Sequence, residues 1–101
     1  RVLELGSGSG LAGLAAGALG AQEVTLSDEV IFLAARNLDA NFSGRPELHK
    51  RFKLRELRWG NKEQIAAAGP PFDLILASDC LYDGGQLDVF CETLLGLSRP
   101  G

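Results

Sequence analysis

Three alternating glycines directly follow a short apolar segment near the start of the chain. Residues 2–5 are Val-Leu-Glu-Leu, and the glycines are Gly6, Gly8 and Gly10. Glycine reaches backbone angles that other residues avoid, and it lets a ligand approach the main chain. Residues 11–19 have helical composition. The region therefore predicts a strand, a glycine loop and a helix, which is typical of the first unit of a nucleotide-binding fold.

The spacing of the glycines permits two interpretations. Gly8, Gly10 and Gly13 match the G-x-G-x-x-G spacing of a dinucleotide site. In such a site, however, the first glycine directly follows the strand. Here that residue is Gly6, and in that register the third glycine is missing. The pattern E-x-G-x-G-x-G that begins at Glu4 fits the strand boundary and resembles motif I of the seven-strand S-adenosylmethionine-dependent methyltransferases.

Periodicity and turn signals predict the remaining elements. We expect further strands at residues 23–27, 52–59 and 72–78, and further helices at residues 31–42, 61–68 and 87–97. The third strand changes its alternation near Arg55 and Glu56, which we attribute to a β-bulge. The continuous apolar run at residues 72–78 is typical of a strand that is buried on both faces.

Alternating strands and helices predict an α/β fold, a Rossmann-like doubly wound parallel sheet. We expect about the first four strands of a seven-strand methyltransferase core, in the order 3-2-1-4. Residues 1–101 would then form one partial domain, whose last strands lie beyond Gly101. Ligands of such sheets bind at the carboxyl ends of the strands. Gly6, Asp28, Trp59 and Asp79 all fall at those predicted ends.

Asp28 and Trp59 are candidate ligand contacts at this edge. A carboxylate at the end of the second strand is able to accept hydrogen bonds from both hydroxyl groups of a ribose. Asp28 also suits the N-cap of the following helix. The Trp59 ring offers a face for a purine, and ordinary core packing explains it equally well.

The end of the fourth strand carries a second chemical signal. Asp79 and Tyr82 lie three residues apart after a buried apolar run. Because an unpaired buried charge is costly, we expect both side chains to serve a group that is bound at the edge of the sheet.

Three segments together resemble one branch of the methyltransferases. Residues 3–14, residues 57–60 (Leu-Arg-Trp-Gly) and residues 77–83 (Ala-Ser-Asp-Cys-Leu-Tyr-Asp) are similar to methyltransferase family 16, the seven-strand protein-lysine methyltransferases. Asp79 and Tyr82 match the D-x-x-Y motif of that family. The resemblance implies methyl transfer from S-adenosyl-L-methionine to a lysine side chain of a protein substrate.

The resemblance also implies roles for single residues. Asp79 and Tyr82 face the incoming amine and are the implied catalytic residues. Asp28 contacts the ribose, Trp59 the adenine side, and Ala77 lines the site through its backbone. The implied cofactor contacts are Glu4, Gly6, Gly8, Gly10, Asp28, Trp59 and Ala77. No metal site is implied.

Two other functions remain open from the sequence. One is a methyltransferase of the same fold that acts on a small molecule or RNA. The other is a noncatalytic nucleotide-binding module of the NAD type. Both share the glycine loop: a methyl product on free nucleic acid would favour the first, and binding of NAD would favour the second.

Charge is unevenly distributed along the chain. The net charge is −3, yet residues 45–62 contain most of the basic side chains. These are Arg45, Lys50, Arg51, Lys53, Arg55, Arg58 and Lys62. The cluster indicates either an acidic partner or a strand with a basic solvent face. No aromatic series is interleaved with it, so we expect no nucleic-acid partner.

Apolar runs and cysteines restrict the cellular setting. No segment approaches the roughly 20 apolar residues of a membrane span, and no signal peptide is visible, so we expect a cytoplasmic or nuclear protein without a membrane partner. Cys80 and Cys91 lack metal-binding spacing, and we expect both to be buried, reduced thiols.

Overall fold

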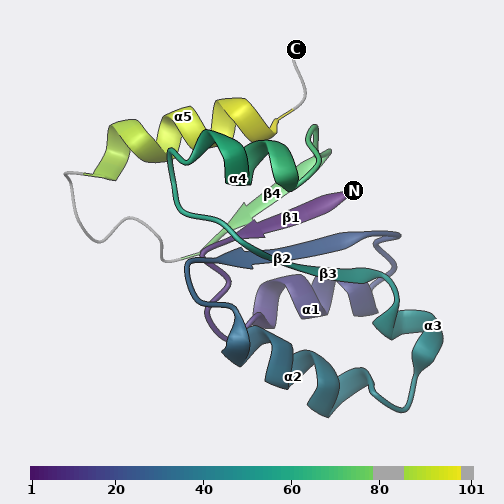
Figure 1. Ribbon diagram of the computed structural model, residues 1–101. Helices are drawn as coiled ribbons and strands as arrows, with labels where there is room; N and C mark the ends of the chain where they lie inside the picture. The colour runs from purple at the N-terminus through teal and green to yellow at the C-terminus, as the bar shows by residue number, and fades with distance from the viewer. Residues whose placement is uncertain (79–85, 99–101) are drawn as a thin grey trace.

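A four-stranded parallel sheet with helices on both faces forms the protein (Figure 1). The computed structural model describes residues 1–78 and 86–98. The elements are β1 (Val2–Leu5), α1 (Leu11–Ala18), β2 (Val24–Asp28), α2 (Phe32–Phe42), α3 (Pro46–His49), β3 (Phe52–Glu56), α4 (Lys62–Ala67), β4 (Leu74–Ala77) and α5 (Leu87–Leu97). The strand order is β3-β2-β1-β4, which confirms the predicted order and the α/β fold class.

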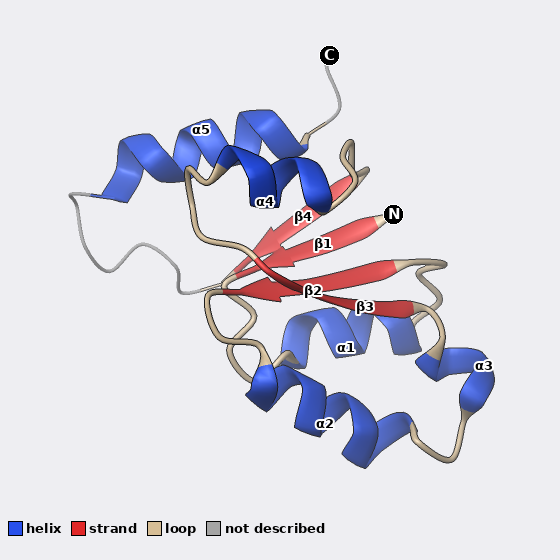
Figure 2. Cartoon of the chain, in the orientation of Figure 1, coloured by secondary structure: helices blue, strands red, loops and turns tan. Residues whose placement is uncertain are grey.

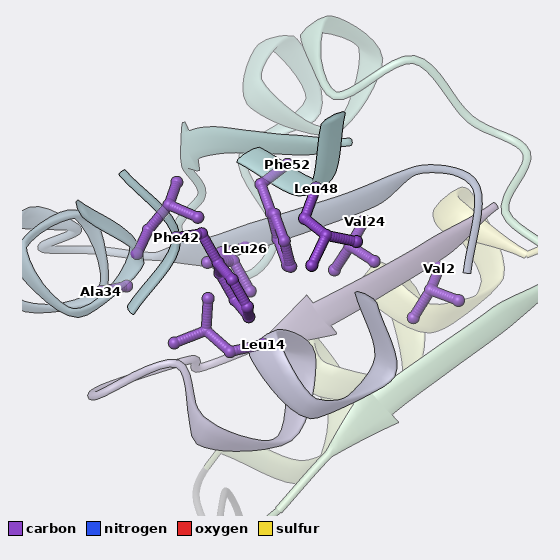
Figure 3. Packing of buried hydrophobic residues seen from close by; sticks show 9 residues of the cluster. Val2, Leu14, Val24, Leu26, Ala34, Phe42, Leu48 and Phe52 are labelled. Atoms are coloured by element: carbon purple, nitrogen blue, oxygen red, sulfur yellow. The ribbon is translucent and has the colours of Figure 1, made fainter. Parts of the chain in front are cut away.

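Helices α1 and α2 cover one face of the sheet, and α4 and α5 cover the other (Figure 2). The first face is packed by an apolar cluster of Val2, Leu14, Val24, Leu26, Ala34, Leu38, Phe42, Leu48 and Phe52 (Figure 3). The rings of Phe42 and Phe52 stack with their centroids 5.4 Å apart, which joins α2 to β3.

A second apolar cluster lies between the sheet and the helices α4 and α5. It consists of Leu3, Leu5, Leu57, Ala68, Phe72, Phe90 and Leu97. Successive side chains of a strand point to opposite faces, so β1 supplies Val2 to the first cluster and Leu3 to the second. All of β1 is buried as a result, as is typical of a central parallel strand.

Two glycines allow α1 to lie close to the sheet. A Cβ atom on Gly17 would overlap the Phe52 ring, and one on Gly13 would overlap the Leu26 side chain and lie 2.8 Å from Glu4 Oε1. Larger residues at these positions would push the helix away from β1 and β2. The close packing of α1 on the sheet therefore requires glycine, which has no side chain, at both positions.

Two expectations about β3 are wrong, namely its bulge and its extent to residue 59. The register of β2 and β3 runs without interruption from Val24 and Phe52 to Asp28 and Glu56, so there is no bulge. The alternation changes because β3 ends at Glu56. The short helix α3 was not predicted; it begins at Pro46, because proline is tolerated in the first turn of a helix.

We expected β4 to be buried on both faces and Cys91 to be buried, and both expectations are wrong. Within the described residues β4 pairs only with β1 and forms an edge of the sheet, so Leu74 is 52% exposed. Cys91 lies exposed on α5 as a free thiol. Cys80 lies outside the described residues. None of the helices described is long and apolar enough to cross a membrane.

We expect Gly17→Ala to lower the free energy of unfolding. Overpacking a core costs about 1–3 kcal/mol, and the Phe52 ring is held by Phe42, so this cost exceeds the gain of about 1 kcal/mol from alanine in a helix. Urea denaturation of the two proteins measures the difference. Gly44→Ala is the control, because no atom lies within 4 Å of its added Cβ. Equal stability of both variants would contradict the close approach of α1.

Candidate functional site

The loop after β1 is shaped by three left-handed glycines. Gly6, Gly8 and Gly10 have φ angles of 62°, 54° and 85°. Side chains with a Cβ atom rarely adopt such angles. A Cβ atom on Gly8 would have no neighbour within 4 Å, so the main chain is open to solvent there. The register that starts at Gly6 is therefore the one in which all three alternating glycines are needed for the backbone conformation.

Asp28 closes the other side of this loop. Its Oδ2 accepts a hydrogen bond from the Gly8 amide (2.8 Å), and its Oδ1 accepts one from the Glu29 amide (2.7 Å). Helix α2 has Ile31 at its N-cap position, so the interpretation of Asp28 as the helix cap is wrong. A carboxylate has about four acceptor positions, and Asp28 thus retains positions for the hydroxyl groups of a ligand.

Glu4 is buried beneath the start of α1. The residue is only 4% exposed, and its Oε1 accepts a hydrogen bond from the Gly13 amide (3.1 Å). Desolvation raises the pKa of Glu4; hydrogen bonds with Gly13 and Ser7 oppose this rise, and the nearby Asp28 charge adds to it. Glu4 supports the loop from below, and its direct contact with a cofactor stays a prediction.

Two serines join the carboxyl ends of β1 and β2, and our sequence analysis did not single them out. The Ser27 amide donates to Ser7 Oγ (3.0 Å), and Ser27 Oγ donates to the carbonyl oxygen of Glu4 (2.7 Å). The Ser7 amide donates to the carbonyl oxygen of Ser27 (2.8 Å). Both serines are buried. Small hydroxyl residues at the ends of two neighbouring strands were the available signal.

Asn37 is a further positioning residue, whose sequence context did not indicate a role. Its Nδ2 donates to the carbonyl oxygen of Ser9 (2.8 Å), which ties the glycine loop to α2. Gly10 also lies against α2, because a Cβ atom there would be 3.3 Å from the Ala34 side chain. The loop is thus held by β2 on one side and α2 on the other.

Trp59 lies at the edge of the second apolar cluster. Its ring packs edge to face with Phe90 of α5, with centroids 4.7 Å apart and an angle of 63°. Trp59 is half-buried, so part of its ring packs against the apolar core. Two residues earlier, the Leu57 amide donates to the carbonyl oxygen of Asp28 (2.9 Å). This bond joins the segment that carries Trp59 to the edge of the sheet that carries Asp28.

Ala77 is the last residue of β4 and pairs with Leu5 of β1. It is exposed, and it lies beside the start of the glycine loop. The structure thus brings Gly6, Asp28 and Ala77 together at the carboxyl ends of adjacent strands. The predicted catalytic residues Asp79 and Tyr82 lie outside the described residues.

The chemistry of this edge suits a nucleoside-type ligand. It combines an open glycine backbone at Gly8 with the carboxylate of Asp28 and the half-buried ring of Trp59. Carboxylates bind ribose hydroxyl groups, and indole rings pack against purines. No group of three or more His, Cys, Asp or Glu side chains able to hold a metal occurs in residues 1–78 and 86–98.

We expect the stability difference between Glu4→Gln and the unchanged protein to depend on pH. The pKa of Glu4 is higher in the folded protein than in the unfolded chain, so protonation of Glu4 favours folding. This contribution to stability is present below the pKa of the unfolded chain and is lost as pH rises through the pKa of the folded protein. Glutamine carries no charge at any of these pH values and keeps an oxygen for the Gly13 amide.

Urea denaturation of both proteins at mildly acidic and mildly alkaline pH measures this effect. The variant should gain stability relative to the unchanged protein as pH rises. Comparison at each pH cancels the titration of all other groups. A difference that does not change with pH would show that Glu4 is not desolvated in the folded protein.

One protein family and several curated proteins are similar to this chain. The family model described as lysine methyltransferase matches residues 1–100. A calmodulin-lysine N-methyltransferase of Arabidopsis thaliana is 43% identical over 89 residues, which cover 81% of this chain and 27% of the relative. The protein N-lysine methyltransferase METTL21A of Mus musculus is 39% identical over 82 residues, which cover 79% of this chain and 36% of the relative.

A yeast relative extends the match to nearly the whole chain. The protein-lysine N-methyltransferase EFM6 of Saccharomyces cerevisiae is 34% identical over 114 aligned residues, which cover 98% of this chain and 44% of the relative. The chain thus spans less than half the length of these curated relatives. The match to the family over residues 1–100, together with the parallel sheet and its glycine loop, shows that the chain belongs to the lysine methyltransferase family.

Proposed function

We propose that the full natural chain uses S-adenosyl-L-methionine to methylate a lysine side chain of a protein substrate. Family membership and the names of three relatives, all of which specify lysine methylation, support this proposal. The observation that carries it is the contact between Asp28 and the Gly8 amide at the carboxyl edge of the sheet. This contact places a carboxylate beside an open main-chain loop, and a site for a nucleoside-type ligand uses both groups.

Asp28 and the glycine loop bind opposite parts of the cofactor in this proposal. The free acceptor positions of Asp28 bind the ribose hydroxyl groups. Gly6, Gly8 and Gly10 give the loop the turn that places its main chain against the methionine part, and the open side of Gly8 leaves room for the ligand. When bound, S-adenosylmethionine supplies an electrophilic methyl carbon, which the lysine nitrogen attacks in line as the carbon–sulfur bond breaks.

Trp59, Ala77 and Glu4 complete the proposed cofactor site. The part of the Trp59 ring that Phe90 leaves free packs on the adenine side. Ala77 lines the site through its backbone, next to Leu5. The buried carboxylate of Glu4 adds negative charge near the methionine part, whose amino group and sulfonium are cationic.

The target amine must lose a proton before it reacts. A free lysine has a pKa near 10.4, so at neutral pH it is almost entirely protonated. Desolvation of the ammonium in a closed site lowers that pKa. We propose, from the family motif, that Asp79 orients the amine through a hydrogen bond and that Tyr82 shapes the pocket around it. Their main contribution is to hold the amine in near-attack geometry.

Cofactor binding tests the site directly. We expect S-adenosylhomocysteine to bind the full natural chain in calorimetric titration, and Asp28→Ala to weaken that binding about tenfold to a hundredfold. This range corresponds to the loss of hydrogen bonds to a charged group, which contribute about 1.5–3 kcal/mol. Glu29→Ala is the matched control, because this neighbouring acid is exposed and faces Arg58 at 3.7 Å. Binding of NAD in place of S-adenosylhomocysteine would overturn the proposed function.

Methylation kinetics test the proposed catalytic acid. We expect Asp79→Asn to lower kcat about a hundredfold, the order of loss that misplacement of a reacting group causes, with unchanged affinity for S-adenosylhomocysteine. Asp88→Asn on α5 is the control, because its residue is an exposed acid in the first turn of that helix. A normal rate for Asp79→Asn would show that Asp79 has no part in the reaction.

A further inference from the structure

The basic residues of the middle of the chain gather on one face of an edge strand. Strand β3 pairs only with β2 among the described strands and forms an edge of the sheet (Figure 1). Phe52 and Leu54 pack into the apolar cluster on the face of α1 and α2. Lys53 and Arg55 alternate with them and therefore lie on the opposite face, and the half-buried Arg51 directly precedes the strand. Arg55 also donates to the carbonyl oxygen of Leu54 (3.4 Å).

Most of this positive charge is not neutralised within the protein. Lys53 Nζ lies 3.0 Å from Glu23, but the same carboxylate also contacts Arg1 Nε at 2.6 Å. One acid thus faces two cations, whose hydrogen bonds lower the pKa of Glu23. In the described part of the chain, no acid lies within ion-pair distance of Arg51 or Arg55.

The positive charge continues to the carboxyl ends of the strands, where the candidate site lies. Arg58 follows β3 and is strongly exposed, 3.7 Å from Glu29. The intervening Leu57 amide donates to the carbonyl oxygen of Asp28. We name Arg51, Lys53, Arg55 and Arg58 the basic strip. It begins near the start of β3 and ends beside Asp28.

Protection of the sheet edge does not by itself explain the basic strip. Charged side chains of either sign keep an edge strand from pairing with another chain. Three alternating positions of one sign repel one another, so mixed signs would protect the edge at a lower cost. The uniform sign indicates a negatively charged partner. The 101 residues have a net charge of −3, so their net charge does not account for attraction of an acidic partner.

We propose that the basic strip docks an acidic segment of the protein substrate and guides it toward the candidate site. This inference rests on the proposed function, since it concerns the protein on which the enzyme acts. Arg51, Lys53 and Arg55 form ion pairs with carboxylates spaced along an extended peptide. Arg58 holds the end of the peptide nearest Asp28. Among the described residues, no aromatic side chain alternates with the cations on the solvent face of β3, since Phe52 packs into the apolar cluster on the other face, and this favours a peptide over RNA.

Binding of a defined acidic probe tests this inference. The probe is a short fluorescein-labelled peptide of alternating glutamate and glycine, measured by anisotropy with the full natural chain. We expect the double variant Arg51→Gln/Arg55→Gln to weaken binding about tenfold, with the loss diminishing at high salt. Arg36→Gln is the control: this arginine is exposed on α2, and no acid in the described ranges pairs with it. The control should bind normally.

A kinetic assay separates docking from catalysis. With an acidic peptide that contains one lysine as methyl acceptor, the double variant should raise KM and leave kcat unchanged. Its affinity for S-adenosylhomocysteine should also be unchanged. Absence of S-adenosylhomocysteine binding by the unchanged protein would refute the proposed function, whereas peptide binding is measured without any cofactor.

Three results would overturn the docking role. The first is equal peptide binding by the double variant and the unchanged protein. The second is equal weakening by Arg36→Gln, which would show a general charge effect. The third is binding of a single-stranded RNA of similar length in place of the peptide, which would assign the strip to nucleic acid.

Discussion

The buried carboxylate of Glu4 determines how the first helix lies on the sheet. Its hydrogen bond to the Gly13 amide attaches the first turns of α1 to β1, and Gly13 and Gly17 leave room for that approach. The loop between β1 and α1 is short and must therefore turn sharply. The left-handed glycines make that turn, and their main chain becomes the open surface of the candidate site.

The rest of the site is held by contacts between neighbouring strand ends. Asp28 accepts from Gly8, and Ser7 and Ser27 connect β1 with β2. Asn37 adds a contact from α2. Because these hydrogen bonds are internal, the loop is arranged before any ligand arrives. Such pre-organisation reduces the entropy that is lost on binding.

The proposed cofactor site and the proposed substrate contacts use different parts of the same sheet. The central strands β1 and β2 end at the glycine loop and Asp28, whereas β3 at the edge presents its cations to solvent. A central parallel strand is buried on both faces and has no side chains free for a large partner. An edge strand is able to keep one face uncovered, and the side chains of that face are free for a partner. The proposed substrate contacts therefore lie on β3, and Arg58 brings them next to the site.

The sequence alone predicted the features that depend on local backbone chemistry. Alternation and helical periodicity indicated the strands and helices, and the glycines marked the loop that only they are able to form. The four-strand order followed from connections that favour one handedness. Contacts between distant segments required the tertiary structure: Glu4 beneath Gly13, Asn37 on Ser9, and Trp59 against Phe90. Packing decides such pairs, and packing depends on which surfaces meet, which local periodicity does not encode.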